Sequence, residues 1–517
     1  MKTKILLLTA LFLNLLSFSN LTGLNGLQAA NYYIATDGSD TNTGTITSPF
    51  ATLNKAQSLV VAGDTVYFRG GTYQIAQSQV MEYSGIFARV FKLDKSGTAQ
   101  RRICYFGYPG EQPVFDLSAV KPANYRVYVF FVSGSYLHFK NFEVVGTQVT
   151  ILDHTQSECF HHEGGNNCIY ENLAMHDGMA IGFYITRGSN NLVLNCDAYN
   201  NWDNVSEDKK GGNVDGFGGH LNSENYPGNV FRGCRAWYNS DDGYDLISNK
   251  SVVTIENCWS WKNGYSTAGA SLGNGAGFKS GGYGMNDSPS VPSVIPRNIV
   301  RFCLAVDNKA QGFYANHHLG GIDFYNNTAY RNPTNYNMVN RQISPLTPAT
   351  DVGGYNHNIK NNVSYSPRTA SSHITQINTT SSVVQNNTWQ LASTASLSAS
   401  DFVFVSTDLT QLAAPRQADG SLPDIDFLKP SATSRLIDKG QDIGFAFEGA
   451  APDLGYREYR APNAVENIMQ NEKDVKTVEY YNITGQRTTP RTKGLIIART
   501  VFTDNSAESR VVLNAWD

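Results

Sequence analysis

Four aspartates and one lysine, spread over residues 215 to 279, could act together: Asp215, Asp241, Asp242, Asp245 and Lys279. Taken singly, each aspartate fits a turn and the lysine fits a solvated surface. Brought together, the carboxylates would repel one another unless a cation neutralised them or some were protonated. Because no Cys or His belongs to the set, its hard oxygen ligands favour Ca²⁺ over Zn²⁺.

A shared Gly-aromatic pair connects these motifs. Five segments carry it: Ile181-Gly-Phe-Tyr184, Asp215-Gly-Phe-Gly218, Asp242-Gly-Tyr-Asp245, Ala276-Gly-Phe-Lys279 and Gln311-Gly-Phe-Tyr314. We align them as one strand on successive rungs of a solenoid, with the aromatic rings stacked in the core. The alignment places Asp215 beside Asp242 and Asp245 beside Lys279, with each pair about one strand spacing (~4.8 Å) apart. It therefore predicts one patch of four acids and a lysine.

A repeat starting near residue 136 predicts the solenoid. The repeat has six positions. The first is Asn or Cys, the third is often Ala, and the last is Asn or Asp, while the second, fourth and fifth positions vary. The first position is occupied by Asn141, Asn172, Cys196, Cys234, Cys258, Cys303, Asn327, Asn362 and Asn386. Four of the eight intervals are 24 residues and the others are 31 to 45, as expected for a fixed rung with loops inserted in some rungs. This period, with short β-branched and aromatic runs, predicts an all-β fold, a right-handed parallel β-helix.

Stacked rungs give the cysteines of this repeat a structural interpretation. Equivalent residues form ladders along a solenoid, and small Cys fills the same inward position as Asn. Cys196, Cys234, Cys258 and Cys303 are therefore predicted to be buried free thiols. A disulfide between adjacent rungs remains compatible with the strand spacing.

The ends of the chain predict three further segments. Residues 1–30 have the charge and apolar pattern of a signal peptide, and no Cys follows to indicate a lipid anchor. The β-helix should span 31–460, beginning with a capping helix from Ser48 and Pro49 to about Val61 and closing with turns at 438–444 and 453–455. Residues 461–517 should form a linker and a small β module, which we expect to be sandwich-like.

Composition excludes some classes of partner. The 517 residues include 40 basic and 44 acidic side chains, so a net charge of −4 gives no electrostatic case for nucleic acid or an anionic membrane. No stretch beyond the N-terminus is suited to membrane insertion. We expect a monomer that a bacterium secretes or holds in the periplasm or at the cell surface.

The order Asp…Asp-Asp-x-x-Asp…Lys on a β-helix resembles polysaccharide lyase family 9, the pectate and rhamnogalacturonan lyases. The resemblance implies that Asp215, Asp241, Asp242 and Asp245 bind Ca²⁺ and that Lys279 is the Brønsted base. The implied substrate is an acidic plant cell-wall polysaccharide, either rhamnogalacturonan I or homogalacturonan. Separately, Tyr480–Gln486 and Lys493–Ile496 resemble the C-terminal sorting or anchoring module of secreted Bacteroidetes enzymes.

Other residues are candidates for binding the polymer. Tyr314 lies one rung beyond Lys279, where it could contact a sugar or be an ordinary surface tyrosine, and Gly218 should leave a gap one rung before Asp245. Further candidates are Arg301 and His220, followed by Trp261, His317 and His318. Two alternatives stay open: a polygalacturonase-type hydrolase using Asp215, Asp241 and Asp242 as acid and base, and a non-catalytic carbohydrate-binding β-helix.

Overall fold

The computed structural model describes residues 29–460, apart from 153–155, 207–208, 286–288, 370–372 and 395, and residues 475–514, apart from 483, 485, 490–493 and 503–506. Nearly all of the predicted signal peptide and all of the linker predicted over Ala461–Asn471 lie outside the described residues. No helix of the described part of the chain is long and apolar enough to cross a membrane.

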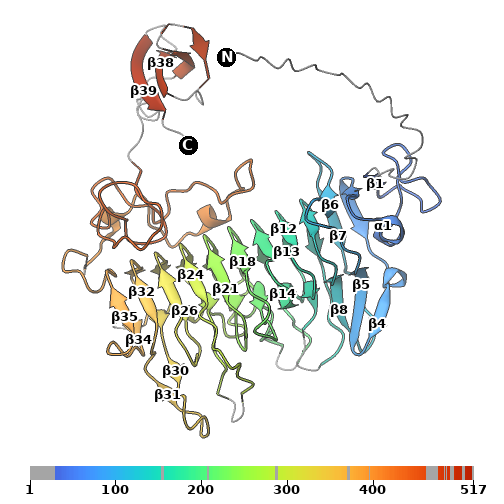
Figure 1. Ribbon diagram of the computed structural model, residues 1–517, viewed down its shortest axis with the longest axis horizontal. Coiled ribbons are helices and arrows are strands. Elements are labelled where there is room, and N and C mark those ends of the chain that lie inside the picture. The colour runs from blue at the N-terminus through green and yellow to red at the C-terminus, as the bar shows by residue number, and fades with distance from the viewer. Residues whose placement is uncertain are drawn as a thin grey trace, which may run out of the picture.

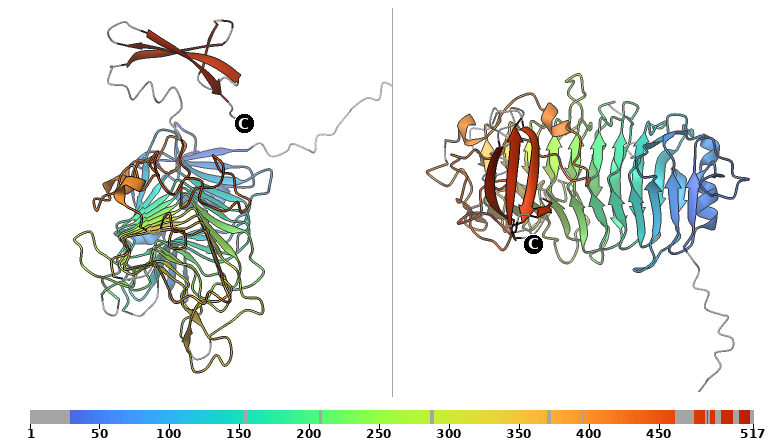
Figure 2. Two further views of the ribbon diagram at one scale, coloured as in Figure 1. Left: turned by 90° about the vertical axis from the view of Figure 1, so that its left-hand side faces the viewer. Right: turned by 90° about the horizontal axis from the view of Figure 1, so that it is seen from above.

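Three long sheets of parallel strands wind into one solenoid, as Figures 1 and 2 show. Sheet 1 contains β1 (Asn31–Ile34), β2 (Thr65–Phe68), β6 (Ile103–Gly107), β9 (Leu137–Lys140), β12 (Ile169–Glu171), β15 (Leu192–Leu194), β18 (Asn229–Arg232), β21 (Val253–Glu256), β24 (Ile299–Arg301), β27 (Asp323–Tyr325), β32 (Asn358–Lys360) and β35 (Val383–Gln385). Sheet 2 contains β3 (Gly71–Gln74), β7 (Pro113–Asp116), β10 (Glu143–Val145), β13 (Ala174–His176), β16 (Asp197–Tyr199), β19 (Arg235–Trp237), β22 (Trp259–Trp261), β25 (Leu304–Val306), β28 (Thr328–Tyr330) and β33 (Val363–Tyr365).

Sheet 3 carries the predicted site. It contains β4 (Glu82–Ser84), β5 (Phe87–Leu93), β8 (Arg126–Val132), β11 (Glu158–Glu163), β14 (Ile181–Arg187), β17 (Phe217–Gly219), β20 (Tyr244–Asp245), β23 (Phe278–Lys279), β26 (Gln311–Tyr314), β29 (Thr334–Asn337) and β34 (Ile374–Thr375). Only the β4–β5 pair among these is antiparallel. Beyond β29, β30 (Asn340–Arg341) and β31 (Asp351–Val352) form a separate antiparallel hairpin.

The Gly-aromatic column has the predicted register. Its rings pair in order on β14, β17, β20, β23 and β26, from Phe183 to Phe313. Successive ring centroids from Phe217 onward are 5.1, 4.7 and 5.0 Å apart, with nearly parallel planes. The rings are buried, so the flanking residues of each strand face outward.

A ladder of buried asparagines supports the turn between sheets 2 and 3. Its members occupy the last position of the repeat: Asn201, Asn239, Asn263, Asn308 and Asn332. Each side-chain amide donates to the next side-chain oxygen at 3.0 or 3.1 Å. Because Asp241 and Asp242 follow Asn239 directly after Ser240, this ladder holds the start of the strands that carry the site.

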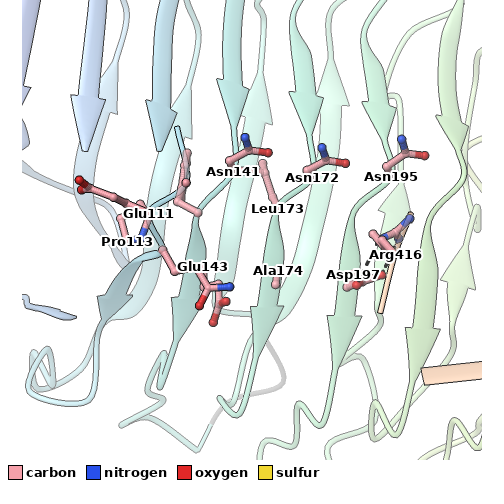
Figure 3. Close-up of a pocket in the computed structure, with 13 residues that line it drawn as sticks. Glu111, Pro113, Asn141, Glu143, Asn172, Leu173, Ala174, Asn195, Asp197 and Arg416 are labelled. Carbon is pink, nitrogen blue, oxygen red and sulfur yellow. Dashed lines mark hydrogen bonds and ion pairs between the residues drawn. The ribbon is translucent and has the colours of Figure 1, made fainter. Parts of the chain in front are cut away.

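Three members of the first-position ladder were assigned one residue too early: Asn141, Asn172 and Asn386. The strand register and the asparagine hydrogen bonds instead align Phe142, Leu173 and Asn387 with Cys196. The outer asparagines have φ between 51° and 61°, a left-handed conformation that Asn tolerates better than most residues. Figure 3 shows Asn141, Asn172 and Asn195 in one row, at the turn between sheets 1 and 2. The four cysteines of the ladder are buried and free, as predicted.

The capping helix α1 (Leu53–Leu59) is shorter than predicted. Ser48 and Pro49 lie before it outside the helix, and Thr52 is the N-cap. The Asp40 carboxylate accepts the backbone N–H groups of Ala51 and Thr52, both at 3.0 Å, and these contacts hold the two residues before the first turn of the helix. Two 3₁₀ helices, η2 (Ala399–Asp401) and η3 (Thr410–Ala413), lie near the other end, and η1 (Gln77–Gln79) lies near the start.

Residues after about 390 fold back over the outer face of sheet 2 instead of forming closing rungs. Phe402, Leu412 and Phe427 belong to an apolar cluster with Trp261 and Tyr330 of that sheet, and the orange-brown segment of Figure 1 follows this path. The predicted closing turns at 438–444 and 453–455 belong to this covering segment, so that expectation is wrong. The physical reason is that the large apolar side chains of sheet 2 require cover.

The C-terminal module contains β36 (Val475–Asn482), β37 (Arg487–Thr488), β38 (Gly494–Phe502) and β39 (Ala507–Asn514). These strands form one antiparallel sheet in the order β37-β36-β38-β39. Within the described residues the module is therefore a single sheet, whereas a sandwich was expected.

Candidate active site

The solenoid brings the lysine to the aspartates. Asp245 on β20 and Lys279 on β23 are direct partners in the strand register. The Lys279 ammonium nitrogen lies 2.9 Å from Asp245 Oδ2 and 3.2 Å from Asp242 Oδ2. This geometric part of the sequence prediction is confirmed. Asp245 also accepts the backbone N–H of Ile247 at 2.7 Å through its other oxygen.

Backbone N–H groups orient the other carboxylates. Asp242 donates its N–H to Asp215 Oδ1 at 3.0 Å, and its own Oδ1 accepts the N–H of Ala276 at 2.6 Å. Asp241 is held from two sides, by the N–H of Asn213 at 2.7 Å and that of Asn274 at 2.6 Å. The carboxylates are therefore fixed by loops on neighbouring rungs.

The donor set fits a hard cation. Asp215, Asp241 and Asp242 each offer an oxygen within 4.8 Å of the others, and their exposed fractions are 3%, 2% and 0%. Asp242 Oδ2 is buried and makes no hydrogen bond, and the Lys279 ammonium at 3.2 Å is its ion-pair partner. Buried carboxylate oxygens gathered in this way suit Ca²⁺. Asp245 lies outside this group of three and is instead paired with Lys279.

Without a bound cation, burial and mutual repulsion of the carboxylates raise the pKa values of Asp215, Asp241 and Asp242. Burial and then the neighbouring carboxylates raise the pKa of Asp215 well above its usual value. Burial and Asp241 raise the pKa of Asp242 to about 8. Burial alone lowers the pKa of Lys279, but the four aspartates outweigh it and raise that pKa well above its ordinary value. A bound cation would relieve the repulsion among the carboxylates and weaken their hold on the lysine proton.

An open cleft of about 370 Å³ adjoins the lysine. Its lining includes Asp242, Lys279, Lys309 and Tyr314. Tyr314 is the strand partner of Lys279 on β26, as predicted. The ring of His317 meets that of Tyr314 edge to face at 6.2 Å, so the structure brings His317 near the cleft as well.

The predicted gap at Gly218 is occupied. A Cβ at this glycine would lie 2.5 Å from Cδ2 of Tyr184, so the Tyr184 ring leans over Gly218 toward the cluster. His220 lies beside it, with ring centroids 4.7 Å apart. The buried Nε2 of His220 makes no hydrogen bond, and burial lowers the pKa of His220. Tyr184 and His220 thus lie beside the aspartates, toward the N-terminal rungs.

Three candidate residues lie elsewhere. Arg301 is on β24 in sheet 1, where it donates to Glu256, so the structure does not bring it to the cluster. Trp261 is 2% exposed on sheet 2 beneath the covering segment. His318 is buried and accepts the N–H of Gly282 at 3.1 Å. Their distance in sequence from Lys279 does not indicate which face of the solenoid they occupy.

Two residues near the cluster, Tyr184 beside Gly218 and Lys309 in the cleft, were missed from the sequence. Tyr184 was aligned in the column but was not assigned to the site. Lys309 directly follows the ladder residue Asn308, at the position that Gly264 occupies after Asn263. Lys309 and Gly264 occupy equivalent positions on neighbouring rungs. A lysine next to a glycine at such a position could have indicated that the lysine side chain extends to the neighbouring rung.

A second groove lies on sheet 2, away from the cluster (Figure 3). Among its charged residues, Asp197 and Arg416 are paired, with Arg416 Nη2 2.6 Å from Asp197 Oδ1. Arg235 pairs with the other carboxylate oxygen at 2.7 Å. The pair between Arg416 and Asp197 fastens the covering segment to the solenoid, and Arg235 adds hydrogen bonds to the carbonyls of Leu412 and Ala414.

The fold and the site define a β-helical protein whose outer face combines a carboxylate cluster with a partly buried lysine. The chain belongs to the Pel9A-like, right-handed β-helix family, whose model matches residues 32–362. It is 32% identical over 429 residues to pectate lyase L of Dickeya dadantii, which covers 82% of this chain and 89% of that protein.

Two solved structures are similar over most of the chain. A rhamnogalacturonan lyase has 50% sequence identity and a TM-score of 0.76, and the match covers 78% of this chain and 97% of that one. The pectate lyase Pel9A has 32% identity and a TM-score of 0.67, with 84% and 98% covered.

Proposed function

We propose that this pectic polysaccharide lyase cleaves a galacturonate-containing backbone by β-elimination, with Lys279 as the Brønsted base. Asp215, Asp241, Asp242 and Asp245 are proposed as the carboxylates that hold Ca²⁺. The observation that carries the proposal is the position of the Lys279 nitrogen, 2.9 Å from Asp245 and 3.2 Å from Asp242 at the edge of an open cleft.

The reaction sets the requirements for these residues. Lys279 must be neutral to take the C5 proton of a galacturonate. The C5–H electrons then form the C4–C5 double bond, and the C4–O bond breaks with its electron pair leaving on the oxygen, which takes up a proton from water. Burial favours the neutral lysine, and the carboxylates oppose it while they are free. Bound Ca²⁺ would supply positive charge against the substrate carboxylate as negative charge develops beside it. Tyr184, His220 and Tyr314 would contact the sugars along the column.

The partner is an acidic plant cell-wall polysaccharide, and both pectic backbones are candidates because the relatives named above include pectate and rhamnogalacturonan lyases. Such a polymer lies outside the cell. Together with the signal-like pattern of residues 1–30, this supports export of the protein.

The test is to incubate the purified protein with homogalacturonan or rhamnogalacturonan I, with Ca²⁺ or with chelator, and to follow ultraviolet absorbance and product size. Absorbance from the C4–C5 double bond should rise with one polymer, and only with Ca²⁺. Shorter products without absorbance would identify a hydrolase. Polymer binding without any product would identify a binding protein.

A further inference from the structure

We propose that Lys309 is a positioning residue for the carboxylate cluster, acting through the peptide unit between Gly273 and Asn274. The proposal rests on the proposed function, because it assumes that Asp241 is one of the calcium ligands. Lys309 does not need to touch the metal or the sugar for this role.

The Lys309 ammonium binds backbone carbonyl groups of the neighbouring rung. It donates to the carbonyl of Leu272 at 2.8 Å and also to that of Gly273. The main chain adds to this contact, because the N–H of Ala310 donates to the carbonyl of Gly275 at 2.9 Å. Lys309 therefore fastens the loop that leads into β23.

One peptide unit links the lysine to the aspartate. The carbonyl of Gly273 accepts from Lys309, and the N–H on the same peptide, that of Asn274, donates to Asp241 Oδ1 at 2.6 Å. A cation on the carbonyl polarises the amide and strengthens the hydrogen bond at its other end. It also fixes the plane of the peptide, and with it the direction of the N–H.

The chain is shaped to let the lysine reach this loop. A Cβ on Gly264 would lie 2.7 Å from the Cβ of Lys309, and a Cβ on Gly275 would lie 2.8 Å from it. Both glycines have φ of +78°, a conformation that favours glycine. The Lys309 stem thus passes over two glycines, one on each side of the loop that it holds.

The test measures Ca²⁺ binding by calorimetry, without polymer, for the wild-type protein and for Lys309→Met. Methionine keeps much of the stem but removes the charge and the donors. Loss of an outer partner of a metal ligand weakens metal affinity about 10- to 100-fold, and we expect a rise of that size in Kd. At saturating Ca²⁺, kcat should return close to the wild-type value. Lys309→Arg, which keeps a charged donor, should recover most of the affinity.

Lys262→Met is the matched control. Lys262 pairs with Asp307 at 2.5 Å and lies over the Tyr265 ring at 5.9 Å, so it contacts the start of the same loop, whereas the carbonyls of Leu272 and Gly273 are bound by Lys309. The Kd of the control should equal that of the wild type. Thermal unfolding in chelator checks folding, and Lys309→Gln replaces the methionine variant if that variant does not fold.

A wild-type protein that fails to bind Ca²⁺ would contradict the proposed metal site itself. An unchanged Kd in a folded Lys309 variant would overturn the positioning role, and a changed KM for the polymer at unchanged Kd would assign Lys309 to substrate binding instead.

Discussion

Lys279 lies directly next to Asp245 in one column of sheet 3, and its ammonium nitrogen is 2.9 Å from the Asp245 carboxylate. Adjacent rungs of a solenoid place such partners at the strand spacing, so the pair follows from the register and not from a flexible loop. The carboxylates of Asp215, Asp241 and Asp242 gather on the same side. A base and a group of metal ligands can therefore face one sugar.

Lys279→Ala should lose about 10²- to 10⁴-fold in kcat, the range contributed by a positioned base. Ultraviolet absorbance of the unsaturated product measures this rate at saturating Ca²⁺. Ca²⁺ affinity should not fall, because the variant keeps all four carboxylates and loses a competing cation. Substantial remaining activity would remove Lys279 from the role of base.

Gly218→Val should displace the Tyr184 ring, since even a Cβ at this position would lie 2.5 Å from that ring. If Tyr184 contacts the polymer, kcat/KM should fall on the order of 10-fold, because small misplacements near a reacting centre are costly. Gly212→Ala is the control, since an added Cβ there meets no atom within 4 Å. Unaltered kinetics for Gly218→Val would place the polymer away from Tyr184.

His161 should make stability depend on pH. Burial alone lowers its pKa, but the carboxylates of Glu158 at 2.5 Å and Glu163 at 3.4 Å outweigh burial and raise the pKa of His161 to about 9. The folded state then holds the proton more tightly than the unfolded state, whose pKa is near 6.5. The stabilisation is fully present below pH 6.5 and is lost as the pH rises through about 9.

Urea unfolding of the wild type and His161→Gln between pH 6 and pH 10 isolates this effect. The difference in the free energy of unfolding should be on the order of 2 kcal/mol at the acidic end, as for hydrogen bonds to charged groups. It should shrink as the pH rises. A difference that is constant with pH would mean that His161 does not carry this proton.

Asn263→Leu should destabilise the fold by on the order of 3 kcal/mol, because it leaves buried polar groups on two neighbouring rungs unpaired. Asn263 accepts the N–H of Asn239 at 3.1 Å and donates to Asn308 Oδ1 at 3.1 Å. Denaturant unfolding measures the loss. Asn358→Leu is the control, since Asn358 is only half-buried and faces outward on β32, and it should cost less than about 1 kcal/mol. Equal losses of stability in the two variants would contradict a stabilising role of the asparagine ladder.

Much of sheet 3 could be predicted from the sequence because its register is strongly constrained. A one-residue shift in the pairing of two strands would turn every buried side chain of the strand to the outer face. Glycine followed by an aromatic residue marks that register on each rung. The first-position ladder was harder, because Asn occurs both at the inward position and at the residue before it, as in Asn387 and Asn386. The residue type does not distinguish these two positions. The backbone conformation does, because the outer Asn386 has a positive φ.

The sequence by itself determined the repeat, the stacked rungs and the meeting of Lys279 with the aspartates, since strand periodicity transfers directly into spatial columns. Only the tertiary structure decided which sheet carries Arg301, that Tyr184 covers Gly218, and that Lys309 reaches Asp241 through a peptide. These relationships depend on the paths of inserted loops and on the corners between sheets. Neither follows the two-residue alternation that makes a strand predictable.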